Sequence, residues 1–254
     1  MNKILLATAA ALLLVAAGMS AQAAPASAAA VRNIVLVHGA LIDGSSWRSV
    51  YDVLTRDGYR VSIVQQPLTG LDEDVAATKR VLDQQDGPVI LVGHSYGGSI
   101  ITVAGSEPKV KALVYVAALQ PDVGETSGEV APPMPPASND LKPTKDGFVF
   151  LDPAKFAADF GADLPKAQAE FMARSQMPVS GAALNAKLTA AAWRDKPSYA
   201  IIATQDRALN PEIARRMAKR AGSKVTVLKA SHAVHISQPR AVAAVIEAAA
   251  RGAK

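Results

Sequence analysis

Short apolar runs alternate with amphipathic segments along most of the chain. Residues 33–37 and 88–92 are almost entirely apolar, which is typical of strands buried on both faces of a parallel sheet. The same patterning predicts further strands at residues 60–64, 110–116, 198–204 and 224–228, and helices at 46–57, 72–85, 99–106, 211–221 and 239–251. Strands joined by helices of this length predict an α/β fold with a mostly parallel, six-stranded sheet flanked by helices.

Residues 120–196 interrupt this alternation. They contain no convincing strand, but they carry the proline-rich stretch 131–136 and short helical patterns at 153–160 and 165–175. An insertion of this size before the penultimate strand predicts a helical lid over the carboxyl edge of the sheet. With this lid included, we expect residues 31–254 to form one domain.

The N-terminal residues have the pattern of a targeting segment. Lys3 is followed by an apolar run over residues 4–17, and Ala21-Gln22-Ala23 provides the small residues that a signal peptidase requires. Residues 1–23 are therefore predicted to be a signal peptide and residues 24–30 a flexible leader, with cleavage after Ala28 as the alternative. The apolar run is too short for a comfortable membrane span, so we expect an exported protein, periplasmic or secreted, with no stable span after cleavage.

Composition narrows the chemistry further. The chain has 254 residues, of which 50% are hydrophobic, consistent with a single medium-sized domain. The formal net charge is +5, but the basic residues are dispersed, and the one dense group at 215–220 fits a solvated helix face. We therefore expect no nucleic-acid partner. The absence of cysteine excludes disulfides, thiolate catalysis and cysteine-based metal sites, and no metal or cofactor is expected.

The segment Gly93-His94-Ser95-Tyr96-Gly97 joins a predicted strand directly to a predicted helix. In this context, Gly-x-Ser-x-Gly predicts a nucleophile elbow, in which a strained turn exposes the serine hydroxyl at the carboxyl edge of the sheet. Ser95 is thus the expected nucleophile. The helix that follows directs its first amides at the same place, and the Tyr96 amide is the expected oxyanion donor.

The general base is sought among four histidines. In a fold with this elbow the chain order is serine, acid, histidine, which removes His38 and His94 and leaves His232 and His235. His232 is favoured because it lies in the loop after the last strand, whereas His235 is expected to be packed or to support the base. His94 is expected to support the elbow turn by hydrogen bonding.

The acid should follow the preceding strand. Asp206 is the one carboxylate in residues 205–211, directly after that strand, and it would hold the neutral imidazole in its productive tautomer. Asp122, after the fourth strand, is the alternative, because a carboxylate there could also reach the base.

These motifs together resemble serine esterases of the α/β-hydrolase superfamily. The resemblance rests on His38-Gly39-Ala40, the elbow at Ser95, Asp206, and His232 with Pro239 seven residues later. It is closest to the group that includes plant methylesterases, hydroxynitrile lyases and pyrethroid-type carboxylesterases. The resemblance implies that the Ala40 amide is the second oxyanion donor. The lyases of this group carry Thr at the position of Gly39 and Lys at that of Ala233, so the resemblance favours the esterases.

The expected function is therefore that of an exported serine carboxylesterase acting on small or apolar carboxylic esters through an acyl-enzyme intermediate. Perhydrolase or lyase chemistry on the same triad, or a non-catalytic ligand-binding scaffold, remain as alternatives. The side chains expected to line an apolar substrate pocket are Leu41, Trp47, Met134, Phe171, Met172 and Met177.

Overall fold

A six-stranded parallel sheet forms the centre of the molecule, in the order β2-β1-β3-β4-β8-β9. The computed structural model describes residues 31–132 and 140–253. The strands of this sheet are β1 (Asn33–Val37), β2 (Arg60–Val64), β3 (Val89–His94), β4 (Val110–Val116), β8 (Ser198–Ala203) and β9 (Lys224–Leu228). Every residue of β1, β3 and β8 is buried, as their continuous apolar sequences predict. The predicted α/β class and six-stranded sheet are confirmed.

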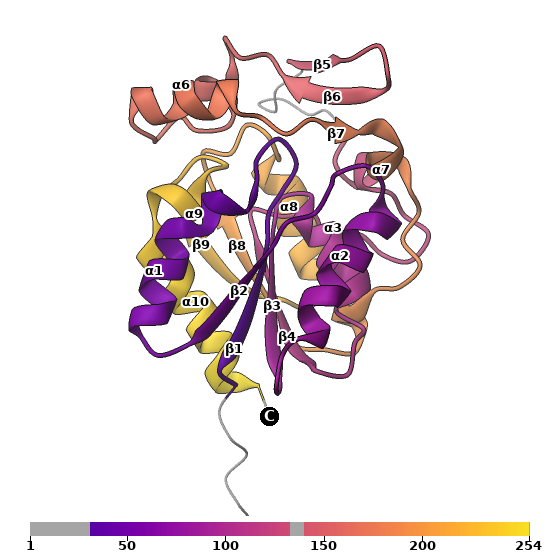
Figure 1. The fold of residues 1–254 in the computed structure, drawn as a ribbon, viewed down its shortest axis with the longest axis vertical. Coiled ribbons are helices and arrows are strands. Elements are labelled where there is room, and N and C mark those ends of the chain that lie inside the picture. The colour runs from indigo at the N-terminus through magenta and orange to yellow at the C-terminus, as the bar shows by residue number, and fades with distance from the viewer. Residues whose placement is uncertain (1–30, 133–139, 254) are drawn as a thin grey trace, which may run out of the picture.

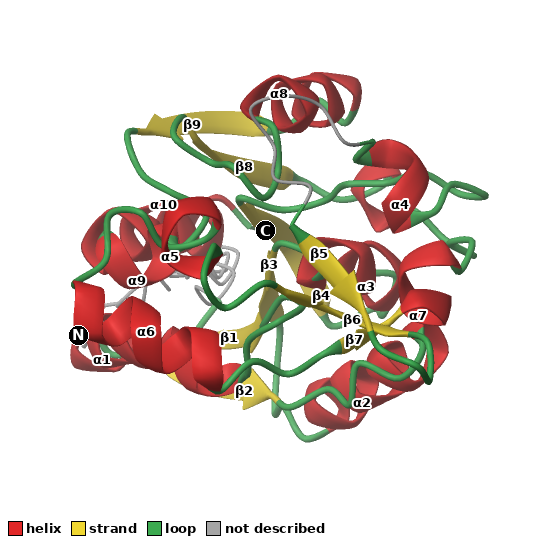
Figure 2. Ribbon diagram, turned by 90° about the horizontal axis from the view of Figure 1, so that it is seen from above, coloured by secondary structure: helices red, strands yellow, loops and turns green. Residues whose placement is uncertain are grey.

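Helices cover both faces of this sheet (Figures 1 and 2). On one face, α1 (Arg48–Arg56) packs against α10 (Pro239–Gly252). On the other, α2 (Leu71–Asp83) packs against α3 (Gly97–Ala104), and α8 (Pro211–Arg220) packs on β8. Each helix layer closes one apolar core with the sheet face beneath it. Five helices are thus found where the sequence predicts helices, with ends that differ by a few residues.

Residues 120–196, which we call the lid segment, leave the sheet after β4 and return at β8. In Figure 1 residues 141–180 of this segment lie above the upper end of the sheet, opposite the end where β1 begins, and the chain then runs down beside the sheet to the start of β8. It contains α4 (Ser127–Val130), β5 (Leu141–Pro143), β6 (Phe148–Leu151), α5 (Phe156–Asp159), α6 (Lys166–Arg174), β7 (Val179–Ser180), α7 (Gly181–Asn185) and the 3-10 helix η2 (Ala192–Arg194).

The expectation that the lid segment contains no strand is wrong. β5, β6 and β7 form an antiparallel sheet of three strands, each only two to four residues long. Strands this short leave no readable alternation in the sequence, and Pro143, which the sheet tolerates in its edge strand, weakens the signal further. The predicted helices at 153–160 and 165–175 correspond to α5 and α6.

The predicted signal peptide and leader lie outside the described residues. Within residues 31–132 and 140–253, no helix combines the length and the hydropathy needed to cross a membrane.

Backbone strain gathers at the carboxyl edge of the sheet. Leu41, Leu68, Ser95 and Ala117 have positive φ angles of 68°, 59°, 51° and 43°, and each follows one of the first four strands. Non-glycine residues rarely adopt this conformation, and such strain concentrates at functional sites. The edge beneath the lid segment is therefore where the site is sought.

Candidate active site

Ser95 lies in the turn that joins β3 to α3. Its carbonyl accepts hydrogen bonds from Gly98 N at 2.9 Å and from Leu119 N at 3.1 Å, which hold its left-handed backbone in place. The turn is tight because a Cβ on Gly97 would lie 2.6 Å from the His38 carbonyl oxygen, so only glycine fits there. The short apolar strand and the small residues after it thus present the Ser95 side chain at the sheet edge.

His232 and Asp206 form a buried hydrogen-bonded pair. His232 Nδ1 lies 2.7 Å from Asp206 Oδ2, and the two side chains are 2% and 3% exposed. The other Asp206 oxygen accepts hydrogen bonds from the Ala208 and Leu209 amides at 2.9 Å and 2.8 Å. Asp206 is the acceptor in all three contacts, so His232 donates its proton from Nδ1. The lone pair of the imidazole is then on Nε2. His232 and Ser95 line the same cavity.

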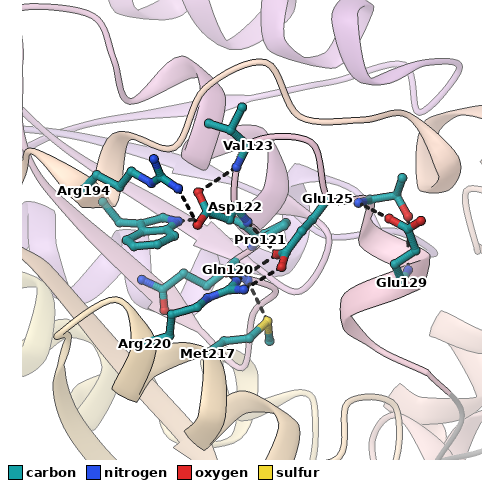
Figure 3. Close-up of polar contacts among 11 residues, drawn as sticks. Gln120, Pro121, Asp122, Val123, Glu125, Glu129, Arg194, Met217 and Arg220 are labelled. Atoms are coloured by element: carbon teal, nitrogen blue, oxygen red, sulfur yellow. Dashed lines mark hydrogen bonds and ion pairs between the residues drawn. The ribbon is translucent and has the colours of Figure 1, made fainter.

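Asp122, the alternative acid, is engaged elsewhere (Figure 3). Its carboxylate accepts hydrogen bonds from Arg194 Nη2 and from the Val123 amide, both at 2.7 Å. Burial opposes the charge of Asp122, but the hydrogen bonds from Arg194 and Val123 outweigh it and hold the pKa of the carboxyl below its usual value. The structure therefore places Asp206, and not Asp122, against His232.

The remaining histidines pack around His232. The ring centroid of His94 lies 4.7 Å from that of His232 and 4.1 Å from that of His235, which also contacts Trp47 at 4.8 Å. His94 Nε2 donates to the His232 carbonyl at 3.0 Å. The expectation that His94 supports its own turn is therefore corrected: its hydrogen bond crosses to the loop that carries the base. His235 is packed, as expected.

Burial keeps these neighbours neutral. It lowers the pKa of His235 to about 3 and lowers that of His94 well below its usual value, and the adjacent histidines add to both effects. Neither ring therefore carries a charge beside His232 at neutral pH.

The loop after β1 lies against the elbow. A Cβ on Gly39 would lie 2.7 Å from Ser95 Cβ, so the loop can approach the nucleophile this closely only with glycine at this position. His38 is fully buried and donates from Nδ1 to the Gly39 carbonyl at 2.8 Å, which fixes the loop. Ala40 and Tyr96, the residues of the two expected oxyanion donors, line the same cavity as Ser95.

A part of the lid segment that sequence reasoning missed is fastened to the loops of Asp206 and His232. Asp163 accepts hydrogen bonds from the backbone amide and hydroxyl of Ser231 and, at 2.8 Å, from Ser237 Oγ. Phe160 contacts the same loop. Its carbonyl accepts a hydrogen bond from Ala233 N at 3.0 Å, and its ring lies edge-on to that of His232 with 4.8 Å between the ring centroids.

On the other side, Asp159 forms an ion pair at 3.0 Å with Arg207, the neighbour of Asp206. No local motif marks either contact, because Asp163 and Ser231 are 68 residues apart in the chain.

The cavity beside Ser95 has a volume of about 210 Å³ and a mostly apolar wall. Leu119 and Leu209 come from the core side, and the lid segment contributes Val149, Leu151, Phe160, Val179 and Leu184. Ser127, which also lines the cavity, is hydrogen-bonded to Ser99 at 2.8 Å. The wall can thus receive an uncharged, apolar group next to the nucleophile.

Most of the expected pocket residues lie elsewhere. Leu41 lines the cavity, but Trp47 is completely buried behind the histidines. Phe171 is 72% exposed, and with Met172 and Leu41 it borders a second cavity of about 250 Å³ beside α1. Met177 packs against the core of the α2 and α3 face. Met134 lies outside the described residues.

Within the described part of the chain, no three acidic, histidine or cysteine side chains are grouped so that they could hold a metal ion.

The fold and the arrangement around Ser95 are those of a serine hydrolase. The chain belongs to the alpha/beta hydrolase family, whose model matches residues 34–245.

Its relatives include esterases and hydrolases. A pyrethroid hydrolase of Sphingobium wenxiniae is 28% identical over 85% of this chain and 86% of its own length. A carbendazim hydrolyzing esterase of Nocardioides is 34% identical over 37% of this chain, and the match spans 45% of that protein. Methylesterase 8 of Arabidopsis thaliana is 28% identical over 36% of this chain and 39% of its own length. The family and these relatives identify the chain as a carboxylic ester hydrolase.

Solved structures show the same fold. A pyrethroid hydrolase from Sphingobium faniae superposes with a TM-score of 0.72 at 24% identity, covering 87% of this chain and 97% of that one. An extracellular α/β-hydrolase from a Paenibacillus species superposes with a TM-score of 0.74 at 19% identity, covering 85% and 98%.

Proposed function

We propose that the chain is an exported serine carboxylesterase that hydrolyses small or apolar carboxylic esters through an acyl-enzyme intermediate. The observation that carries the proposal is the buried His232–Asp206 pair, which opens onto the same apolar cavity as the strained Ser95. A serine beside a neutral, oriented imidazole is the arrangement that activates a hydroxyl for attack on a carbonyl.

In the first half of the reaction, Ser95 Oγ attacks the ester carbonyl and transfers its proton to His232 Nε2. Asp206 stabilises the imidazolium that forms, and the amides of Ala40 and Tyr96 donate to the tetrahedral oxyanion. When this intermediate collapses, the carbon–oxygen bond to the alcohol breaks and His232 returns the proton to the leaving oxygen. An acyl-Ser95 ester remains.

In the second half, water attacks the acyl carbonyl and gives its proton to His232. Collapse of the second intermediate releases the carboxylic acid and returns the proton to Ser95 Oγ. The low pKa values of His94 and His235 support this scheme, because both rings stay uncharged at neutral pH and do not repel the imidazolium that forms on His232.

The cavity supports the substrate class. Its wall is formed mainly by aliphatic side chains and Phe160, and burial of an apolar group there is favourable by about 25 cal/mol per Å². The relatives named for pyrethroid and carbendazim hydrolysis support an apolar substrate as well. Export is supported by the basic, apolar and small-residue pattern of residues 1–23. Mass spectrometry of the protein from cell fractions and medium would test it, with a new N-terminus at Ala24 expected.

The decisive test of the reaction is Ser95→Ala, assayed with nitrophenyl esters of increasing acyl length. We expect kcat to fall at least about a thousandfold. We also expect a fluorophosphonate probe to label the wild-type chain at Ser95 only. Ser106→Ala, an exposed serine just after α3, is the matched control and should keep full activity. Near-normal ester hydrolysis by Ser95→Ala would overturn the proposal.

A further inference from the structure

Tyr96 carries two groups with separate surroundings. The residue lies at the start of α3 and lines the cavity beside Ser95, whereas its side chain is buried and runs into the core on the α2 face of the sheet. There its hydroxyl donates a hydrogen bond of 2.9 Å to Oδ2 of Asp74, a residue of α2. The amide expected to bind the oxyanion is thus tied by its own side chain to a second helix.

Asp74 is completely buried and uses both carboxyl oxygens. Oδ1 accepts the Leu68 amide at 2.8 Å, while Oδ2 accepts the Tyr96 hydroxyl. Burial raises the pKa of Asp74 to about 6, against the opposing effect of its two hydrogen bonds, so the group is a carboxylate at neutral pH and can accept from both donors. Each carboxyl oxygen of Asp74 thus has a hydrogen-bond donor within the protein.

Leu68 extends this connection to the lid segment. It is held in the left-handed conformation with a φ of 59°, and its carbonyl accepts a hydrogen bond of 2.8 Å from Ser180 N in β7. Val179, the other residue of β7, lines the cavity. A chain of three hydrogen bonds therefore runs from the elbow, through Asp74 and Leu68, to the wall of the substrate cavity.

We propose that Asp74 is a positioning residue for the oxyanion hole. It fixes the position of Tyr96 through the tyrosine hydroxyl, and it fixes the cavity wall through Leu68. This inference rests on the proposed function, because it assumes that the Tyr96 amide stabilises an oxyanion. The elbow is strained at Ser95, and small displacements of a reacting group have large effects on rate. Asp74 touches neither substrate nor nucleophile; its effect passes through the orientation of the Tyr96 amide.

Tyr96→Phe removes the connection while keeping the ring. Loss of a whole oxyanion donor costs about a hundredfold to a thousandfold in kcat, so a donor that is present but loosened should cost about tenfold. KM should change less than twofold, and the affinity for a trifluoromethyl ketone, whose adduct carries the oxyanion, should fall by the same factor as kcat/KM. A general loss of structure would not give this division between kcat and KM.

Tyr96→Phe also leaves Asp74 as a buried carboxylate with one donor fewer, so the variant should be less stable. In the double variant Tyr96→Phe/Asp74→Asn, the buried charge is gone and the amide oxygen can still accept from Leu68 N. We expect this variant to regain thermal stability but to keep the low kcat of Tyr96→Phe. If kcat returns together with stability, the residue acts on stability alone and the proposal is overturned.

Tyr115→Phe is the matched control. Tyr115 is also buried, and its hydroxyl bonds Thr102 in α3 at 2.9 Å, so the variant loses a hydroxyl of the same kind without loosening Tyr96. Its kcat should stay within twofold of wild type, and an equal loss in both Phe variants would count against the proposal. Unchanged kcat and inhibitor affinity in Tyr96→Phe would overturn it, provided that Ser95→Ala is inactive; an active Ser95→Ala would instead refute the proposed function.

Discussion

Asp206→Asn separates the role of the acid from its contribution to structure. In the wild type, Oδ1 of Asp206 accepts two backbone amides and Oδ2 accepts His232 Nδ1. The amides of Ala208 and Leu209 can only donate, so the asparagine oxygen must remain with them and its NH₂ group must face His232. That NH₂ group needs an acceptor, which forces the imidazole into the tautomer that carries its proton on Nε2. The base then has no lone pair for the Ser95 proton.

The size of the loss of kcat follows from what the substitution leaves unchanged. Loop geometry is preserved because both amide contacts survive, and the change acts almost entirely on the protonation of His232. Asparagine in this position typically lowers kcat about ten-thousandfold, or about 5.5 kcal/mol in the activation free energy. The assay is steady-state hydrolysis of a nitrophenyl ester at pH 8, with thermal unfolding of the same samples as the structural check.

Asp122→Asn is the control, because Asp122 was the alternative acid from the sequence. It should retain full kcat and lose only its exposed ion pair with Arg194, which solvent screens, so its stability should change little. A variant Asp206→Asn with more than a tenth of the wild-type kcat would refute the reasoning, as would a large loss of kcat in Asp122→Asn.

Three further predictions concern other parts of the site. Gly39→Ala places a methyl group 2.7 Å from Ser95 Cβ. We therefore expect kcat to fall more than tenfold and the free energy of unfolding to fall by about 1–3 kcal/mol, and unchanged kinetics would contradict the observed contact. Burial lowers the pKa of His235 to about 3, so its stabilising contribution is complete above pH 6.5 and is lost as the pH falls towards 3. The melting temperature of His235→Phe should therefore fall less between pH 6.5 and pH 4 than that of the wild type. Parallel plots of melting temperature against pH would refute this. Leu184→Phe narrows the cavity from the lid side and should lower kcat/KM for long acyl esters more than for acetate esters; an equal change for both would place the acyl group elsewhere.

The central sheet could be predicted because its strands are buried on both faces. A strand such as β4 must be apolar at nearly every position, and that requirement is visible in a single sequence. The elbow could be predicted for a similar reason, since the tight approach of β3 and α3 demands glycine at fixed spacings around Ser95. In both cases the local sequence carries the whole physical constraint.

The cavity and the lid segment could not be predicted in this way. Leu119, Leu151 and Leu209 all line the cavity, but they belong to separate segments and have no spacing in common. Phe171 resembles a pocket residue by composition alone, but its side chain is mostly exposed. The contacts of Asp163 with Ser231 and of Tyr96 with Asp74 likewise depend on how distant segments pack.

The strained residues at the strand ends show how the fold maintains this site. A left-handed conformation costs a non-glycine residue about 1–2 kcal/mol, so Leu68, Ser95 and Ala117 must each be held by their surroundings. The hydrogen bonds that hold them come from neighbouring strands, from α2 and from the lid segment. Ala117 N donates to the Ile201 carbonyl at 2.9 Å, Ser95 N to that of Val116 at 3.3 Å, and Leu68 is held by Asp74 and Ser180. Only the completed sheet and the docked lid segment provide these partners together. The nucleophile is thus strained only in the folded enzyme, and the contacts that keep it so also shape the cavity wall.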